Sequence, residues 1–238
     1  WHRYFLGNTK FLGVVAILCK IQHVFRPHRP PTACNTSHSS PQNIRARREM
    51  PPSDSANWMR EASRFVHAHR QKTFVVYLGG EVLRSDGIDE CVEDLILLAG
   101  LGIKIVLVHG ARPQIDAACQ AAGVNSSFVN DLRITNSDVF ASVKSAVVTT
   151  RIELEAKLAR AALDTVDRKA TITIVGGTFV IARPKGIVAG KDTGLAGEIR
   201  RVDAAAINHA LSDGSIVLLS PLAYSASGEA FNMNALEM

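Results

Sequence analysis

Short apolar runs alternate with segments of helical periodicity along most of the chain. Val, Ile and Leu dominate these runs, and IKIVLV is apolar at every position except Lys104, as expected of a strand that helices cover on both sides. Glycine, histidine or serine follows each run. The four predicted strands are TFVVYL from residue 73, IKIVLV from 103, TITIV from 171 and SIVLLS from 215.

Apolar residues spaced three and four positions apart predict helices between these runs. Segment 58–69 places Trp58, Met59, Ala62, Phe65, Val66 and His69 on one helix face. Residues 179–202 are rich in turn formers and predict a hairpin. Strand and helix alternate in the rhythm of crossover connections, which predicts an α/β fold with a mostly parallel sheet between helices. The other predicted helices cover 87–99, 114–122, 137–163 and 203–212, the last capped by Asp203.

Basic charge is concentrated at the N-terminus. The chain of 238 residues is 47% hydrophobic and carries a formal charge of +5. Its first 48 residues contain eight Lys or Arg and no Asp or Glu, which leaves 19 basic and 22 acidic residues in the remainder. The folded part therefore has no basic excess, and nucleic acid is not an expected partner.

Residues 1–57 are predicted to be a leader and linker, with one folded domain over 58–238. An acid-poor segment rich in Arg and Ser is typical of organelle transit peptides. A secretory signal is disfavoured because no small-x-small cleavage pattern follows the apolar stretch 11–19, and a disordered extension without an address is the other alternative. That stretch is shorter than the roughly 20 residues of a membrane-spanning helix. We expect no membrane segment.

Glycine follows three of the predicted strands. Ligands of open parallel sheets bind at the carboxyl ends of the strands, where glycines let backbone N–H groups approach an anion. Simple turn chemistry is the competing interpretation of each glycine pair. Neither GxGxxG nor GxxxxGK[ST] occurs, which disfavours a dinucleotide site and a P-loop. Four scattered cysteines and the histidines show no metal-ligand spacing, and a disulfide framework is not expected.

Six segments together resemble the N-acetylglutamate synthases that contain an amino-acid kinase fold, of the plastid and bacterial two-domain type. The resemblance runs from about Trp58 to Asn234 and rests on the order and spacing of the segments. It implies the three-layer amino-acid kinase-like fold, and we expect the C-terminal part of that fold to be incomplete in this chain. The segments are YLGG, VLVHGARPQI, DLRITNSD, RIELEA, TGLAGEIRRVD and SIVLLSPLAYSASGEAFN.

The resemblance also exposes two departures from a working kinase. Kinases of this fold have a lysine where this chain has Tyr77, and an all-glycine loop where it has Ala111 and Arg112. Phosphoryl transfer requires that cation and that open backbone. We therefore expect the loop to be an inherited phosphate cradle that no longer handles phosphate, although Arg112 is equally compatible with an ordinary ion pair.

By resemblance, two further residues belong to a ligand pocket. Arg133 matches the arginine that holds an amino-acid carboxylate, with a structural ion pair as the alternative. Asn232 matches a pocket asparagine. His109 is expected to make ordinary hydrogen bonds, and neither a catalytic residue nor a metal ligand is predicted. The candidate ligand-binding residues are Gly79, Gly80, Gly110, Ala111, Arg112, Arg133 and Asn232.

The functional expectation is the kinase-like regulatory portion of an N-acetylglutamate synthase, which makes N-acetylglutamate and CoA from acetyl-CoA and glutamate. The resemblance implies arginine as feedback inhibitor, acetyl-CoA bound by a second domain, no cofactor in this chain, and no acetyl transfer by this chain alone. We also expect a homo-oligomer formed through the 58–69 helix and a location in the plastid stroma, or alternatively the mitochondrion. An active amino-acid or carbamate kinase, and a non-catalytic assembly module from a shortened transcript, are the alternatives.

Overall fold

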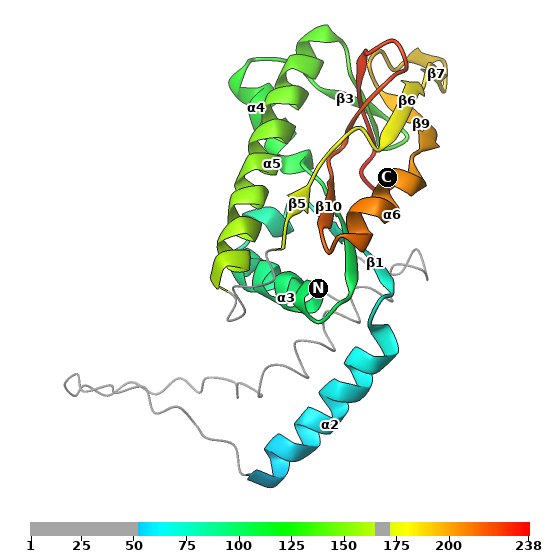
Figure 1. Ribbon diagram of the computed structural model, residues 1–238. Coiled ribbons are helices and arrows are strands. Elements are labelled where there is room, and N and C mark those ends of the chain that lie inside the picture. The colour runs from blue at the N-terminus through cyan, green and yellow to red at the C-terminus, as the bar shows by residue number, and fades with distance from the viewer. Residues whose placement is uncertain (1–51, 165–171) are drawn as a thin grey trace, which may run out of the picture. The chain divides into compact units, whose positions relative to one another are not determined.

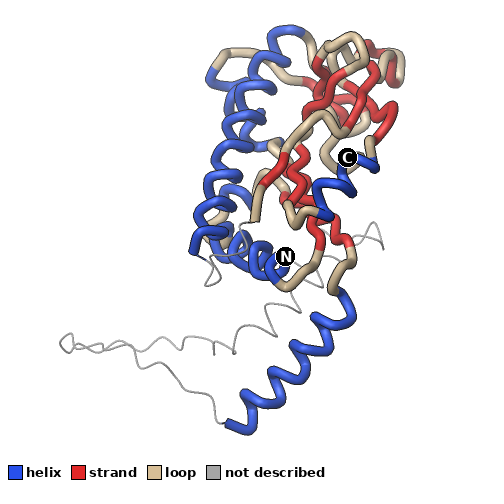
Figure 2. The backbone as a smooth tube through the Cα atoms, viewed as in Figure 1, coloured by secondary structure: helices blue, strands red, loops and turns tan. Residues whose placement is uncertain are grey.

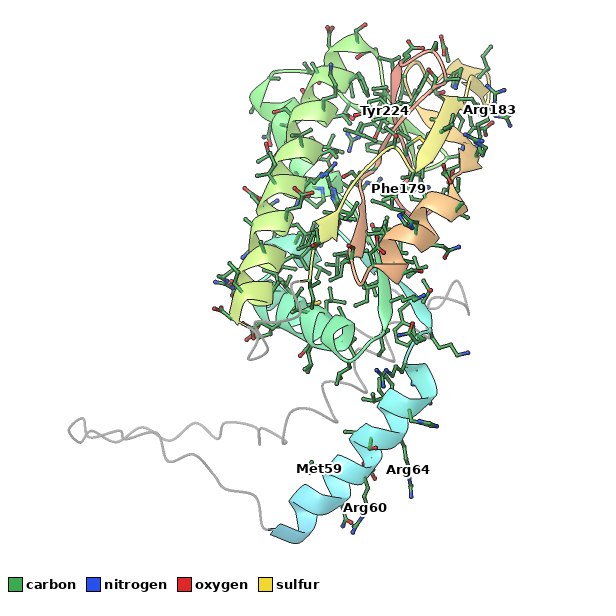
Figure 3. The ribbon with its side chains drawn as sticks, in the orientation of Figure 1. Met59, Arg60, Arg64, Phe179, Arg183 and Tyr224 are labelled. Atoms are coloured by element: carbon green, nitrogen blue, oxygen red, sulfur yellow. The ribbon has the colours of Figure 1, made fainter. Side chains whose placement is uncertain are left out.

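The structure, a computed structural model, describes residues 52–164 and 172–238. Residues 1–51, which make up most of the expected leader and linker, lie outside the described residues. The chain divides into two compact units, of which the first ends at His69 and the second begins at Arg70. The described part of the first unit is helix α2 (Pro52–His69), which begins before the predicted segment 58–69. Met59, Arg60 and Arg64 project outward from it (Figure 3).

A four-stranded parallel sheet forms the centre of the second unit. The strand order is β1-β2-β10-β5, and β10 therefore lies between strands that precede it in sequence. This order confirms the predicted parallel sheet, in which crossover connections join neighbouring strands. The strands are β1 (Thr73–Leu78), β2 (Lys104–His109), β5 (Ile174–Val175) and β10 (Ile216–Leu219).

Strand β5 is shorter and less buried than the sequence predicts. Only Ile174 and Val175 pair with β10, and both are half-buried rather than buried. An apolar run predicts a fully covered strand, but β5 is at an edge of the sheet and has a neighbour on one side only. Residue 171, where the predicted strand starts, lies outside the described residues.

Helices cover both faces of the sheet, as the sequence predicts (Figures 1 and 2). Side chains alternate between the two faces of a strand. Val106 and Val108 of β2 therefore point to one face, where they pack with Leu211 of α6. Ile105 and Leu107 point to the opposite face and are also buried. The helices are α3 (Ile88–Gly100), α4 (Arg112–Ala121) and α5 (Ser137–Asp164) on that opposite face, and α6 (Ala204–Ser212), with the 3-10 turn η1 (Val82–Arg84).

A second sheet of order β12-β11-β6-β9 follows the carboxyl end of β10. The predicted hairpin at 179–202 is confirmed, because β6 and β9 pair antiparallel. Its apolar face has its own core of Val180, Ala182, Ala223, Phe231 and Met233. The additional strands are β3 (Ser127–Val129), β4 (Leu132–Ile134), β6 (Val180–Pro184), β7 (Ile187–Val188), β8 (Lys191–Asp192), β9 (Gly197–Val202), β11 (Leu222–Tyr224) and β12 (Ala230–Asn232).

Phe179 lies between the second sheet and α6 (Figure 3) and belongs to the apolar cluster beneath that helix. It therefore helps to join the two sheets on the α6 side. Within the described part of the chain, no helix has the length and apolar character needed to cross a bilayer.

Asp203 is the N-cap predicted for α6, and its Oδ1 accepts a hydrogen bond from the backbone N–H of Ala206 at 3.0 Å. We expect Asp203→Ala to lower the free energy of unfolding by about 1 kcal/mol, because the N–H loses its partner. Asp213→Ala, at the other end of the helix, should change it by less than about 0.5 kcal/mol. Urea unfolding of both variants measures this. Equal losses in the two would show that the cap contributes nothing specific.

Candidate functional site

The carboxyl ends of the parallel strands lie at one edge of the central sheet. Leu78 is paired with His109, and Leu219 with Val108, so the loops that follow these strands start side by side. A Cβ built on Gly110 would lie 3.2 Å from the backbone nitrogen of Gly80. The structure therefore brings together the two glycine loops that the sequence predicts to form a ligand site.

Tyr77 occupies the space above the second glycine loop. Its hydroxyl would lie 2.7 Å from a Cβ at Gly110, so any larger residue there would collide with the phenol. Burial raises the pKa of Tyr77, the nearby Glu81 carboxylate adds to this, and Arg112 opposes it. The phenol consequently remains protonated and neutral at physiological pH. It cannot replace the cation that phosphoryl transfer requires.

The glycine loop after β1 is closed from the side of α4. Gln114 donates a hydrogen bond from Nε2 to the Gly80 carbonyl at 2.9 Å. A Cβ on Gly80 would lie 2.5 Å from the Gln114 Oε1 and 2.6 Å from the Pro113 Cδ. Gly80 therefore allows close packing of the chain against itself. The buried Oε1 of Gln114 has no hydrogen-bond partner among the described residues.

Arg151 packs against Gly176, the glycine that follows β5. A Cβ on Gly176 would overlap the Arg151 guanidinium, which reaches this point from α5. Its Nε donates to Glu155 at 2.8 Å, which fixes the orientation of the guanidinium plane. Sequence reasoning did not single out Arg151 as a site residue. Its only signal is its membership of the RIELEA segment.

His109 is completely buried at the end of β2 and joins two strands. Its Nε2 is 2.9 Å from the Ser220 Oγ after β10, and its Nδ1 is 3.3 Å from the Gly110 carbonyl. Burial lowers the pKa of His109 to about 4, and the hydrogen bond to Gly110 only partly offsets this. The imidazole is therefore neutral near pH 7. The expected role of His109 as a hydrogen-bonding residue agrees with these contacts, and Ser220 is the partner that the sequence did not reveal.

Arg133 is buried and ion-paired. Its Nη2 lies 2.6 Å from Asp116 Oδ1, and its Nη1 donates to the Ser126 hydroxyl. Its guanidinium also lies over the Phe128 ring, 4.6 Å from the centroid, and that of Arg112 lies 4.7 Å from the same centroid. Of the two interpretations of Arg133, the structure shows the internal ion pair. Carboxylate binding would require an exchange of Asp116 for the ligand.

Two other predicted residues have internal roles. Ala111 is buried and occupies the N-cap position of α4, where it has no side chain that could cap. Asn232 is also buried, and its Nδ2 donates to the Thr135 Oγ1 at 3.0 Å. Thr135 in turn donates to the Arg133 carbonyl at 3.0 Å. Two successive hydrogen bonds through Thr135 thus connect Asn232 with Arg133.

The described residues contain no group of three or more His, Cys, Asp or Glu side chains able to hold a metal ion.

Burial and the Asp94 carboxylate raise the pKa of the Cys91 thiol to about 11, so this cysteine is not a ready nucleophile. Side chains, among them the neutral Tyr77 phenol and the Arg151 guanidinium, fill the space at the glycine positions of the strand ends.

Buried neutral His109 should make folding sensitive to acid. An unfolded histidine titrates near 6.5 and the folded one near 4, so the unfolded state binds more protons between these values. Stability is therefore complete above about pH 6.5 and is lost as the pH falls towards about 4. Between about pH 7 and pH 4.5 this residue should account for a loss of about 2 kcal/mol.

Urea unfolding of His109→Asn at the two pH values tests this expectation. The variant should lose about 2 kcal/mol less than the unmodified chain on acidification. His209→Asn is the matched control, because the His209 side chain is 83% exposed. An unchanged pH dependence in His109→Asn would contradict the buried neutral state.

Comparison with known proteins gives a consistent family assignment. Residues 72–237 match the amino acid kinase family. The chain is 44% identical over 180 residues to the amino-acid acetyltransferase of Ectopseudomonas mendocina, covering 76% of this chain and 42% of that protein. It is 41% identical over 178 residues to the Ralstonia nicotianae protein of the same name, covering 75% of this chain and 40% of that protein.

A solved structure gives the same result. The N-acetylglutamate synthase from Neisseria gonorrhoeae, complexed with coenzyme A and L-arginine, superposes with a TM-score of 0.68 at 32% identity. The match covers 75% of this chain and 42% of that one. The chain thus spans about two fifths of the length of the relatives that it matches. By the match over residues 72–237 and by its parallel sheet between helices, this chain belongs to the amino acid kinase family.

Proposed function

We propose that this chain is the kinase-like regulatory portion of an N-acetylglutamate synthase, which converts acetyl-CoA and L-glutamate into N-acetyl-L-glutamate and CoA. Relatives named amino-acid acetyltransferase, up to 44% identical, support this proposal. In it, the amino acid kinase fold carries regulation, and acetyl transfer is not performed by the described residues. The pathway served is arginine biosynthesis.

The observation that carries this proposal is the occupation of the glycine positions by the chain's own side chains. Tyr77 covers Gly110, Gln114 packs on Gly80, and a Cβ on Gly176 would overlap Arg151. A phosphoryl-transfer site needs exposed backbone N–H groups and a positive charge near the transferred group. At Gly110 the neutral Tyr77 phenol occupies the space next to the backbone. These features disfavour the alternative of an active amino-acid or carbamate kinase.

L-arginine is the proposed regulatory ligand. The Neisseria synthase was crystallised with coenzyme A and L-arginine, and we extend arginine binding to this chain. Acetyl-CoA and L-glutamate are its proposed substrates as part of a synthase, and the candidate residues Arg112, Arg133 and Asn232 remain proposed ligand contacts. Arg133 is the strongest of the three, because an incoming carboxylate can replace Asp116, whose side chain is 52% exposed.

Thermal unfolding with added ligands tests the proposed function. L-arginine at about a hundred times its Kd should stabilise the chain by about 2.7 kcal/mol, whereas D-arginine and L-lysine should not. Mg-ATP should give no shift, because the glycine loops are closed. Arg133→Lys should weaken the arginine response, since a lysine cannot reproduce the bidentate contact.

Enzymatic assays of the same preparation test the proposed function against the kinase alternative. We expect no CoA thiol release from acetyl-CoA and L-glutamate, and no ADP from ATP with amino acids. Tyr77→Lys should also form no ADP, because Gln114 and Arg151 still occupy their glycines. ADP formation by the unmodified chain would establish the kinase alternative and overturn this proposal.

Location and assembly are two further parts of the proposal. The leader, residues 1–57, directs the chain to the plastid stroma, with the mitochondrion as the alternative, and it lies largely outside the described residues. The apolar face of residues 58–69 mediates self-association. Met59 on that face is 64% exposed, and Phe65 stacks with His69 at 4.2 Å between ring centroids.

A fusion of residues 1–57 to a fluorescent protein tests the address. Isolated chloroplasts should import and shorten the fusion, because the segment lacks acidic residues up to Glu49 and is rich in Arg and Ser. A fusion that starts at residue 58 is the control and should remain outside. Import by mitochondria alone would select the alternative, and no import by either would exclude a transit peptide.

A further inference from the structure

The ion pair between Arg133 and Asp116 joins a buried group to an exposed one. The Arg133 side chain is 5% exposed and that of Asp116 is 52% exposed, with 2.6 Å between Nη2 and Oδ1. A buried guanidinium needs a partner, because an uncompensated charge in the interior is strongly unfavourable. A carboxylate at the surface has no such need, since water can solvate it. Arg133 therefore requires a carboxylate, but not necessarily that of Asp116.

Asp116 uses only part of the Arg133 guanidinium. It accepts from Nη2 through Oδ1, and Nη1 donates to the Ser126 hydroxyl. Among the described residues, Nε of Arg133 makes no side-chain hydrogen bond. Guanidinium and carboxylate bind most strongly when two parallel N–H groups donate to two oxygens. A ligand carboxylate that makes this two-oxygen contact can therefore compete with the single-oxygen contact of Asp116.

The β3–β4 hairpin holds Arg133 in place independently of Asp116. Arg133 on β4 lies directly opposite Phe128 on β3, and its Cζ is 4.6 Å from the centroid of that ring. The Ser126 hydroxyl, just before β3, accepts from the same guanidinium. Asp116, in contrast, belongs to α4. The hairpin thus presents a fixed guanidinium, and the carboxylate that covers it comes from another element.

A second guanidinium lies on the same aromatic ring. The Arg112 Cζ is 4.7 Å from the Phe128 centroid. Arg112 has no ion pair among the described residues. Two positive groups beside one ring therefore share the single carboxylate of Asp116. This local excess of positive charge favours the approach of an anionic group.

We propose that Asp116 is an internal competitor of the ligand: its carboxylate occupies Arg133 in the free chain and must leave before a ligand carboxylate can bind. This inference rests on the proposed function, since it concerns the same contact at Arg133, and it adds what sets the affinity there. The described structure is then the closed state of the site. The apparent Kd equals the intrinsic Kd divided by the fraction of molecules in which Arg133 is open. Asp116 thereby raises the ligand concentration at which the site fills.

Calorimetric titration of the full chain with L-arginine tests the competition. Asp116→Asn should bind at least about tenfold more tightly than the unmodified chain, because a pair closed in about nine molecules of ten weakens the apparent affinity tenfold. Asp116→Glu keeps the carboxylate and should stay within about threefold of the unmodified chain. Asp131→Asn is the matched control: it removes the same charge from the exposed turn of the same hairpin and should change the Kd less than about twofold. Circular dichroism verifies that each variant is folded.

Two further probes isolate the carboxylate. L-argininamide has none and cannot take the place of Asp116, so Asp116→Asn and the unmodified chain should bind it equally, within about twofold. Acetate consists of little else, and Asp116→Asn should bind it at least about tenfold more tightly than the unmodified chain does. An equal gain in affinity for L-argininamide, or an equal effect of Asp131→Asn, would assign the change to net charge and overturn the inference.

A crystal structure of the unmodified chain with L-arginine tests the exchange without any variant. The ligand carboxylate should contact Arg133, and Asp116 should point into solvent. A ligand bound while the pair of Arg133 and Asp116 stays intact would refute the competition and leave arginine binding in place.

The titrations also separate this inference from the proposed function. L-arginine binding by Asp116→Asn that is equal to or weaker than that of the unmodified chain overturns the competition alone. Binding by Asp116→Asn with none by the unmodified chain supports the competition and contradicts arginine regulation of the unmodified chain. No binding of L-arginine or acetate by either chain overturns both.

Discussion

Parallel pairing of β1, β2 and β10 is the constraint on which the rest of the structure depends. Adjacent parallel strands bring their carboxyl ends to one edge, and the register pairs Leu78 with His109 and Leu219 with Val108. The loops that begin there converge from segments far apart in the sequence. Every candidate site residue near the glycine loops takes its position from this pairing. The hydrogen bond between His109 and Ser220 joins the two inner strands at the same edge.

The strand ends keep the glycine positions of an anion-binding scaffold, while side chains of the same chain lie against them. Glycine at positions 80, 110 and 176 still allows close approach, but the approaching groups are Gln114, Tyr77 and Arg151 of the same chain. Close packing of another part of the chain on the backbone requires glycine for the same reason as close approach of a phosphate, because neither leaves space for a Cβ. A glycine-rich loop is therefore informative about function only together with the side chains that surround it.

Much of the first sheet could be predicted from sequence because its determinants are local. Apolar runs identified β1, β2 and β10, and Asp203 identified the start of α6. Strands β11 and β12 of the second sheet and the β3–β4 hairpin were missed, since their three-residue strands carry too few alternations to form a pattern. Strand β5 was predicted too long because an apolar run does not reveal a position at the edge of a sheet.

The site was less predictable because its contacts are long-range. Tyr77 and Arg112 could be identified as departures from a kinase, but the sequence left two interpretations of Arg133, and only the structure shows its pairing with Asp116. Arg151 reaches Gly176 from a different element, and Ser220 is 111 positions from His109. No local pattern encodes such distances. Resemblance located the loops, whereas the groups that fill them had to be seen in three dimensions.

The position of β10 also has a consequence for synthesis of the chain. Because β10 inserts between β2 and β5, one edge of β2 remains unpaired until residues 216–219 leave the ribosome. The nascent chain must carry an incomplete, strongly apolar strand while more than a hundred further residues are made. Unpaired edges of this kind promote aggregation. The central sheet can therefore be completed only after β10 has been made, and chaperone protection is needed most before β10 appears.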